Sequence, residues 1–577
     1  MAQKPPLTYG AVIGNTIQTI NLISMGVQMC RAVMPKQEPT YQPPPLENTD
    51  PMEGLASGTE LETYQYRSGS FYLGNIHPEH GQNFEAGVMV RDELTGECVP
   101  DDRHIFIVAG NAGGKGRSLI IQNAIRWKGG AVFLDPKGEL ASITAMRRGT
   151  AEAAKGSGTS VRRFIGQQVA ILDPYGETDG AARRYLVRYN PLSDIDIKSE
   201  EAQGQIKKIA SACIIPEEGK NSFFSESAET ILAGAIEAVL LTYPKAEHNL
   251  SFVRKMLLNS FDDLLDILQD IKPRHLLREK IKVVDGKKKL FREVQKSRGR
   301  IPDDGLAAEA LGMLSDVIGT DEAGAFKTTL SRNLKWLSEP QIQRHVDTSD
   351  VSLKAIVQSG GTVYIVVPPN RIDDLKCWLR IITQTAINAK ISLGVNQKTQ
   401  PTLFMLDEFP LLGNFKEIEK SAGFLRGYNC KITCVIQNIG QIKQHYAKNW
   451  ETFLGNAGAI IGFATNDLET EEYLSKRMGK ILAWETSYSI NSGVSAQMMG
   501  GSVSDGKTTS QAQRERGVRL SNEIHEMTAR ETMRAFVIPA SGKPFSILRQ
   551  NYDAIEMPGI YDSPQMCIEW NQRYGSN

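Results

Sequence analysis

A glycine-rich turn between a strand and a helix is the feature that most constrains this chain. A β-branched run at residues 105–108 predicts a buried strand, and an apolar helical pattern begins at Leu119. Glycines let successive backbone N–H groups converge, a helix N-terminus favours negative charge, and a lysine reaches outer phosphates. We therefore predict a phosphate-binding loop, or P-loop. After Ala109, its residues are Gly110, Asn111, Ala112, Gly113, Gly114, Lys115, Gly116 and Arg117.

The turn departs from the usual P-loop pattern at two positions. Ala109 stands at the first glycine position, and Gly116 replaces the hydroxyl residue that normally binds Mg²⁺. A water molecule, or Ser118 at a longer reach, must then complete the metal shell. A purely structural turn is the alternative interpretation, and two later segments argue against it.

Those two segments are apolar strands that end in polar side chains. Residues 402–406 lead into Asp407 and Glu408, and residues 431–436 lead into Gln437. Asp407 is suited to hold Mg²⁺, and Glu408 to orient and deprotonate an attacking water. Gln437 suits a sensor that hydrogen-bonds the γ-phosphate or its water. Alone, the acid pair would more simply be a solvated strand end, and Gln437 an ordinary loop amide. Together with the P-loop they predict ATP and Mg²⁺ as cofactors.

Composition limits the remaining possibilities. The chain has 577 residues, 41% of them hydrophobic and 23% charged, which predicts a globular protein too long for one compact core. Its 66 basic and 66 acidic residues balance, so any contact with nucleic acid or a membrane must come from a local patch. The seven cysteines show no metal-binding spacing and are expected to be reduced thiols.

Strand patterns that alternate with helical patterns predict an α/β fold with a mainly parallel, doubly wound sheet. We assign residues 69–196 and 337–552 to the nucleotide-binding domain, residues 197–336 to an all-α insertion, and residues 553–577 to a tail. Residues 489–513, rich in Gly, Ser and Gln, predict a mobile loop. The other strands are expected at 131–134, at 169–172, before Asn190, and at 361–368, 457–464, 533–539 and 545–550.

The N-terminal region carries no clear transmembrane segment. Residues 11–30 lack charge, but polar side chains interrupt them, and the apolar positions recur at helical spacing. Within residues 1–34 we predict an amphipathic helix that docks on a partner or lies at a membrane interface, with a degenerate signal anchor as the alternative. Residues 35–68 form a proline-rich linker.

Two groups of basic residues are candidates for binding. Residues 272–300 contain twelve basic and three acidic side chains, a net charge of +9. This cluster predicts a DNA contact through Lys287, Lys288, Lys289 and Arg292, and a solvated loop is the alternative. Arg103, just before the P-loop strand, either faces the nucleotide of a neighbouring subunit or is an ordinary surface arginine.

The motifs, taken in order, resemble the type IV secretion coupling proteins, the TraG/TraD/TrwB group of conjugative ATPases. The matching segments are the P-loop, LDPKGE, NPL, GTVYIVVPPNR, LDEFPLLG, FLRGYNCKITCVIQN and GFATNDLETEEYLSKRMGK. The resemblance implies a RecA-like P-loop NTPase with an inserted all-α domain. It further implies that Lys115 binds the β- and γ-phosphates, that Asp407, Glu408 and Gln437 act as described, and that Arg426 reaches into a neighbour's site.

The same resemblance implies a homo-hexameric ATPase at the cytoplasmic face of the bacterial inner membrane. Such a ring would recruit and deliver, or translocate, a DNA–relaxase complex or secreted proteins to a type IV secretion channel with its ATPases and inner-membrane components. Family members usually carry two transmembrane helices ahead of the motor, whereas this sequence has only the weak segment at residues 11–30 there. We therefore expect this chain to be anchored weakly or through a partner. The alternatives are a nucleotide-controlled recruitment platform for effectors and a soluble DNA pump of the HerA/FtsK group.

Overall fold

A computed structural model describes most of the chain after its N-terminal region. The helix predicted within residues 1–34 and the first part of the linker lie outside the described residues. No helix among those described is long and apolar enough to cross a membrane. The described residues are 52–92, 95–217, 222–259, 264, 268, 275–284, 287–296, 305–395, 400–415, 418, 423–446, 449–495, 502–555 and 557–574.

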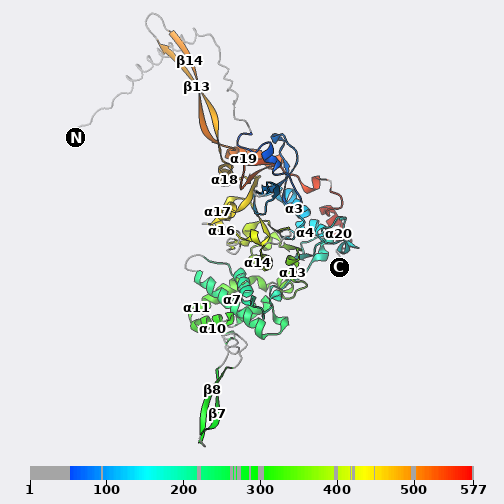
Figure 1. Ribbon diagram of the computed structural model, residues 1–577, viewed down its shortest axis with the longest axis vertical. Coiled ribbons are helices and arrows are strands. Elements are labelled where there is room, and N and C mark those ends of the chain that lie inside the picture. Colours follow the sequence, from blue (N-terminus) through cyan, green and yellow to red (C-terminus); the bar gives the residue numbers. More distant parts are fainter. Residues whose placement is uncertain are drawn as a thin grey trace, which may run out of the picture. The chain divides into compact units, whose positions relative to one another are not determined.

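One mixed sheet organises this part of the chain (Figure 1). Twelve of the described strands form it, in the order β3-β2-β1-β16-β15-β12-β4-β11-β10-β5-β9-β6. The strands are β1 Phe71–Ile76, β2 Glu85–Arg91, β3 Cys98–Pro100, β4 His104–Ala109, β5 Ala131–Asp135, β6 Val169–Leu172, β9 Thr362–Val366, β10 Thr402–Leu406, β11 Cys430–Ile436, β12 Ala457–Phe463, β15 Arg534–Pro539 and β16 Phe545–Leu548.

The half of the sheet from β12 to β6 is parallel, and the half from β15 to β3 is antiparallel. Every residue of β4, β5, β9, β10 and β11 is buried. Parallel strands covered on both faces need continuous apolar runs, which explains why their sequences were easy to identify. The predicted α/β fold with a doubly wound, mainly parallel sheet is confirmed.

Helices cover the sheet and build the insertion. Helical periodicity in the sequence at 226–241, 307–318 and 375–393 falls within or over α7, α10 and α14. The helices are α2 Thr59–Glu62, α3 Ile121–Arg126, α4 Glu139–Arg148, α5 Ala151–Ala154, α6 Ala202–Cys213, α7 Ser222–Thr242, α8 Leu250–Asn259, α10 Leu306–Val317, α11 Asp321–Asn333, α12 Pro340–Val346, α13 Leu353–Gln358, α14 Lys376–Ile391, α16 Ile439–His445, α17 Trp450–Gly455, α18 Leu468–Met478, α19 Ser521–Met527 and α20 Pro564–Tyr574.

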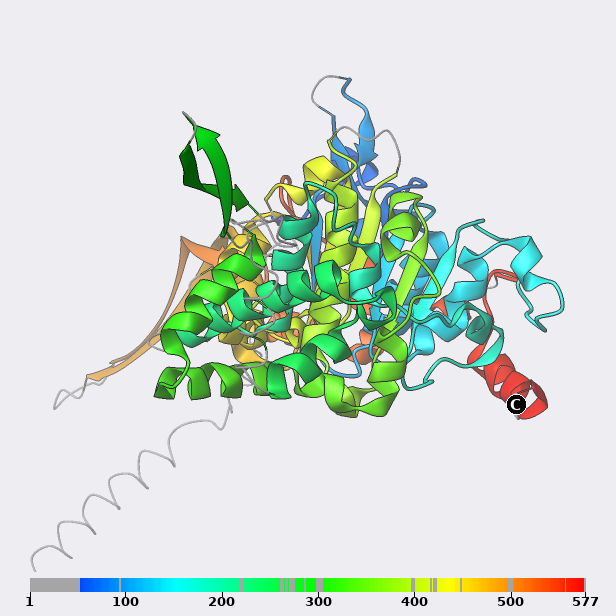
Figure 2. The same cartoon turned by 90° about the horizontal axis from the view of Figure 1, so that it is seen from below.

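Among its described residues, the insertion is helical except for one strand pair. Helices α7, α10 and α11 pack together in it (Figure 2), whereas β7 (His275–Val284) and β8 (Lys287–Lys296) pair antiparallel as a separate sheet. Asp285 and Gly286 separate these two strands in the sequence, and Asp-Gly is typical of hairpin turns. The all-α prediction missed this hairpin because the dense lysines obscured the alternating pattern of the strands.

The mobile loop predicted at 489–513 is wrong. The described residues of this stretch, 489–495 and 502–513, belong to two paired strands, β13 (Lys480–Ser495) and β14 (Ser502–Gly517), which pair antiparallel along their full lengths as a second hairpin. This ribbon is a separate two-stranded sheet, so its strands need no apolar face to attach them to the main sheet. Hydrophobic alternation, the usual sequence signal for a strand, was therefore absent.

The strand expected before Asn190 is also wrong. Only an isolated bridge between Ile171 and Leu186 extends the sheet there within the described residues, and a short 3₁₀ helix, Pro191–Asp194, follows. The Asn190 side chain caps this helix by accepting a hydrogen bond from the Leu192 N–H. The Asn-Pro-Leu motif therefore builds a turn, which its proline already favoured.

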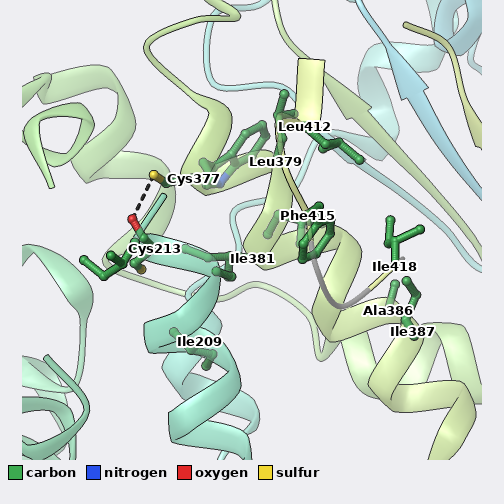
Figure 3. Close-up of a cluster of buried hydrophobic side chains, with 14 of the residues drawn as sticks. Ile209, Cys213, Cys377, Leu379, Ile381, Ala386, Ile387, Leu412, Phe415 and Ile418 are labelled. Atoms are coloured by element: carbon green, nitrogen blue, oxygen red, sulfur yellow. Dashed lines mark hydrogen bonds between the residues drawn. The ribbon is translucent and has the colours of Figure 1, made fainter. Parts of the chain in front are cut away.

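The insertion joins the nucleotide-binding part through a packed apolar cluster (Figure 3). Cys377 of α14 donates its thiol to the carbonyl oxygen of Cys213 in α6, at 2.9 Å. Leu412 and Phe415, which follow the predicted acid pair, belong to the same cluster. The first helix of the insertion and the segment after the acid pair therefore share one core with α14.

Candidate active site

Four predicted side chains meet at the carboxyl edge of the parallel strands. Strand β4 leads into the P-loop, β10 ends before Asp407 and Glu408, and β11 lies between them and ends before Gln437. Lys115 Nζ lies 2.5 Å from Glu408 Oε1 and 3.3 Å from Asp407 Oδ1. Gln437 Nε2 donates to both Glu408 oxygens, at 3.0 and 2.9 Å. Residues far apart in sequence thus form one polar cluster.

The P-loop adopts a shape that small residues permit. Ala112 and Gly114 have positive φ values of 56° and 84°. A Cβ atom on Gly110 would stand 2.2 Å from the carbonyl oxygen of Ala464, to which the Gly110 N–H donates at 3.2 Å. At Gly116, in contrast, an added Cβ would meet nothing within 4 Å. Close backbone packing therefore requires a glycine at position 110, whereas the site leaves room for a side chain at position 116.

Ser118 bonds the P-loop backbone and Arg549 through its hydroxyl. Its side chain is fully buried, and its hydroxyl donates to the Gly114 carbonyl at 2.8 Å and accepts from Arg549 Nη1 at 3.2 Å. These bonds place the hydroxyl against the loop backbone, so the geometry does not support the predicted contact of Ser118 with Mg²⁺. Asp407 and Glu408 remain suitable, because Mg²⁺ commonly takes one or two protein carboxylates and otherwise binds phosphate and water.

Burial changes the charge preferences of this cluster. It raises the pKa of the Asp407 carboxyl, and the Glu408 charge adds to this effect while Lys115 opposes it. Burial acts against the Lys115 ammonium, but Asp407 and Glu408 more than offset it and raise the lysine pKa. Lys115 is therefore held as a cation, and the carboxylates carry negative charge that it balances. A bound phosphate would take over this lysine.

The backbone of Glu408 is strained. Its φ and ψ angles of 62° and 52° lie in the left-handed region, which residues other than glycine rarely occupy. Such a conformation costs about 1–3 kcal/mol and is found mostly at functional sites. It turns the chain sharply after β10 and leaves the Glu408 carboxylate against Lys115 and Gln437.

Asp135 supports the same edge from β5, the neighbour of β10. It accepts hydrogen bonds from the backbone N–H groups of Ala141 at 2.8 Å and Lys137 at 3.3 Å. Burial raises the pKa of this carboxyl to about 7, and the charge of Asp407 contributes. Asp135 therefore organises the turn into α4.

Arg103 and Arg426 lie at the amino-terminal ends of the parallel strands, opposite to the ends that carry the Lys115 cluster; we call these ends the amino edge. Arg103 precedes β4 and Arg426 precedes β11, so each stands one strand length, about 20 Å, from the cluster around Lys115. Arg103 Nη2 contacts Asp101 Oδ2 at 2.7 Å, and Arg426 Nε contacts Asp102 Oδ1 at 2.7 Å. Both arginines line a cavity of about 160 Å³. Neither reaches the P-loop of its own chain.

Two other predicted groups lie apart from this cluster. The Arg117 side chain is exposed and pairs with Asp553. Lys287, Lys288, Lys289 and Arg292 stand on β8 of the insertion hairpin, a sheet separate from the one that carries the P-loop. Their contact with DNA stays a prediction.

Arg549 is a residue at the site that the sequence reading missed. It follows β16, is 1% exposed, and donates through Nη1 to the Gly113 carbonyl at 2.9 Å. The one available signal was an arginine directly after an apolar strand, and that signal is common. Only the order of the sheet shows that this strand end approaches the P-loop.

Comparison with known proteins agrees with this architecture. The sequence model of the family described as Type IV secretory system Conjugative DNA transfer matches residues 59–552. VirD4 of Rhizobium radiobacter is 25% identical over 395 residues, which cover 67% of this chain and 50% of VirD4. TraG of Escherichia coli is 26% identical over 414 residues, covering 69% of this chain and 58% of TraG. The chain thus spans little more than half the length of these curated relatives.

Solved structures show the same fold. The unbound conjugative coupling protein TrwBdeltaN70 superimposes with a TM-score of 0.54 at 14% identity, over 87% of this chain and 94% of that one. TrwB in complex with ADP and Mg²⁺ gives a TM-score of 0.53, also at 14% identity, over 88% and 96%. The family model matches most of the described residues, including the P-loop and the strand β10 that precedes Asp407 and Glu408. This match decides the assignment. The chain belongs to the type IV secretory system conjugative DNA transfer family.

Proposed function

We propose that this protein is an ATP-hydrolysing coupling protein that recruits and delivers, or translocates, a DNA–relaxase complex or secreted proteins to a type IV secretion channel. Membership of the conjugative DNA transfer family supports the transport role. The observation that carries the enzymatic role is the contact of Lys115 with Glu408, which Gln437 also contacts. A P-loop lysine, a strand-end carboxylate and a polar sensor at one edge are the parts that nucleotide hydrolysis needs.

Each side chain of the cluster has a distinct task in this proposal. Lys115 exchanges Glu408 for the β- and γ-phosphates when ATP binds, which frees the Glu408 carboxylate to accept a proton from water. Gln437, already a donor to Glu408, holds that carboxylate and the water in line. Asp407 would hold the Mg²⁺ shell, and a bound ion would supply positive charge against the phosphates.

Arg426 completes the site of another copy of the chain. Because Arg103 and Arg426 lie a strand length from their own P-loop, a contact with phosphate requires a neighbouring subunit. The proposed assembly is a homo-hexamer, in which the amino edge of one subunit faces the nucleotide of the next. We place it at the cytoplasmic face of the inner membrane, beside channel ATPases and inner-membrane components.

The steady-state ATPase rate, measured against protein concentration with and without single- and double-stranded DNA, tests this function. We expect a cooperative, DNA-stimulated rate in the wild type. Replacing Lys287, Lys288 and Lys289 by Gln should lower the salt slope of DNA binding by about two to three units and leave the DNA-free rate unchanged. A rate per subunit that changes with neither protein concentration nor DNA would instead favour a recruitment platform.

A further inference from the structure

Arg549 ties the antiparallel half of the sheet to the P-loop. Its guanidinium enters beneath the loop from the end of β16, where Nη1 bonds both the Gly113 carbonyl and the Ser118 hydroxyl. The same guanidinium lies 3.8 Å from the centre of the Phe463 ring, at the end of β12. The side chain is therefore fixed from three sides, by the loop, by the helical turn after it and by an aromatic ring.

The hydrogen bonds of Arg549 and Ser118 set the orientation of two successive peptide groups. In a planar trans peptide the carbonyl oxygen and the amide hydrogen point in opposite directions. Arg549 holds the Gly113 oxygen, so the Gly114 N–H points away from the guanidinium. The backbone N–H and the hydroxyl of Ser118 hold the Gly114 oxygen at 3.0 and 2.8 Å, so the Lys115 N–H points away from Ser118.

Consecutive N–H groups freed in this way form a concave anion-binding nest. Gly114 has a φ of 84° and Lys115 a φ of −52°, and such alternation of left- and right-handed residues is the backbone pattern of a nest. A loop that lacks both the first glycine and the hydroxyl of the usual pattern still obtains its phosphate-binding shape, because Arg549 and Ser118 hold its carbonyls from below.

The charge of Arg549 is incompletely balanced inside the protein. Its Nε and Nη2 groups donate to no acceptor within the part of the chain that the structure describes, and none of the ion pairs found there includes it. Burial lowers the pKa of this guanidinium to about 10. A phosphate bound on the other side of the loop would supply the missing negative charge, so anion binding and the buried arginine stabilise each other.

We propose that Arg549 is a positioning residue of the phosphate-binding loop, which holds the Gly113 and Gly114 peptides ready for an anion and makes the end of β16 part of the nucleotide site. This inference rests on the proposed binding of ATP at the P-loop. It assigns a role in nucleotide affinity to a strand end that lies outside the P-loop, acid and sensor motifs.

The test compares Arg549→Met with Arg380→Met. Arg380 is a matched control: it is 1% exposed, contacts one carbonyl, that of Ser211, lies 5.0 Å from the Phe415 ring, and has two unpartnered nitrogens among the described residues. The dissociation constant of a fluorescent ADP analogue and the unfolding temperature without nucleotide are measured for each. Arg549→Met should weaken binding about 10- to 100-fold, whereas Arg380→Met should lose a similar amount of thermal stability and keep its affinity.

A double-mutant cycle separates positioning from a general loss of stability. If Arg549 and Ser118 hold the loop as one unit, combining Arg549→Met with Ser118→Ala should weaken binding by less than the product of the two single effects. Affinity within twofold of wild type in Arg549→Met, or equal weakening in Arg380→Met, overturns the proposal.

A second variant covers the case in which Arg549→Met does not fold. Arg549→Lys keeps the charge but not the planar guanidinium, so it should bind the analogue several-fold more weakly than wild type. Wild-type affinity in that variant overturns the inference. No binding by the wild type would instead overturn the proposed function itself, on which the inference rests.

Discussion

The two ends of strands β4 and β11 carry opposite kinds of charged cluster. At the carboxyl ends, Lys115 is only 14% exposed and contacts the carboxylates of Asp407 and Glu408. Gln437 donates a hydrogen bond to the Glu408 carboxylate. At the amino ends, Arg426 is 56% exposed and pairs with one exposed aspartate. The first cluster is closed and suits a small anion, whereas the second is open and suits a protein surface. In the proposed function, one sheet thus presents the phosphate site at the carboxyl ends of its parallel strands and an arginine for a neighbour's site at their amino ends.

The two arginines at the amino edge are held with different strength. Asp101 is buried, binds Arg103 through both its oxygens, and lies beside the buried Lys431, which donates to the Asp101 carbonyl at 2.6 Å. Asp102 is exposed and makes a single contact with Arg426. Exposed ion pairs contribute little free energy. Arg103 is thus fixed in place, whereas Arg426 can leave Asp102 at small cost.

The largest expected effect concerns the carboxyl edge alone. Lys115→Ala should abolish nucleotide binding, because it removes the cation that two carboxylates now hold in the site. Glu408→Gln should keep binding but lower ATP hydrolysis by about 10²- to 10⁴-fold, since a neutral amide cannot accept the proton of water. Fluorescent nucleotide binding and phosphate release measure the two steps separately. Normal hydrolysis by Glu408→Gln would show that another group is the base.

The next effect joins the two edges. Arg426→Ala should leave nucleotide affinity of the isolated subunit unchanged and lower hydrolysis by about 10³-fold or more, the usual contribution of an arginine supplied by a neighbour. The measurement is the ATPase rate at a protein concentration where the wild-type rate has reached its plateau.

Mixing two inactive variants distinguishes a neighbour's arginine from one that acts within the same chain. Lys115→Ala subunits retain Arg426, and Arg426→Ala subunits retain the nucleotide site. In rings formed at random from equal amounts of the two variants, about a quarter of the sites would have an intact Lys115 beside a neighbour with an intact Arg426. About a quarter of the wild-type rate should therefore return. No recovery in mixtures that still assemble would contradict the shared site.

Sequence alone predicted the carboxyl edge much better than the amino edge. Asp407, Glu408 and Gln437 come at the ends of short apolar runs, and Lys115 ends the glycine-rich turn after another such run. Parallel strands bring such ends together. The two-sided burial of the strands made those runs continuous and easy to recognise. The fold class was predictable for the same reason.

The features that escaped prediction depend on three-dimensional contacts. Arg549 reaches a loop 436 positions earlier in the chain, through an antiparallel strand order that no local pattern reveals. The direction of the Ser118 hydroxyl depends on how the turn after Lys115 is wound, as a π-helix from Gly116 to Ile120. Asp101 and Asp102 look like an ordinary solvated turn until their arginine partners are placed.

A smaller effect contrasts two buried carboxylates, one at each edge. The pKa of Asp135 is raised to about 7 by burial, so the folded state binds a proton between about pH 4 and 7 that the unfolded state has lost. Stability should therefore fall as pH rises through this range, and Asp135→Asn should remove that slope. At pH 8 the variant should be more stable than wild type, by about 4 kcal/mol at most.

Asp101 should behave in the opposite sense. Burial acts to raise its pKa, but Arg103 and Lys431 outweigh burial and lower it below the ordinary value of 3.8. Its contribution to stability is present above that value and is lost as pH falls through the lowered pKa. Asp101→Asn should therefore destabilise the fold at pH 7, and the difference from wild type should shrink in acid. Urea unfolding from pH 3 to 8 measures both variants, and equal slopes for the two would contradict the contrast.

The smallest effect tests whether Asp102 competes for Arg426 before assembly. Asp102→Asn removes the charge that holds the exposed guanidinium, which leaves Arg426 free to meet the phosphates of a neighbouring site. Exposed pairs are worth roughly 0.2–1 kcal/mol, so the protein concentration at half-maximal ATPase rate should fall by about 1.4- to fivefold. Asp350→Asn is the matched control, because Asp350 and Arg188 form an exposed pair at 2.8 Å and neither residue belongs to the proposed site. A shift of the same size in both variants would assign the effect to overall charge. A shift in Asp102→Asn alone would show that Asp102 competes with the phosphates of a second subunit for Arg426.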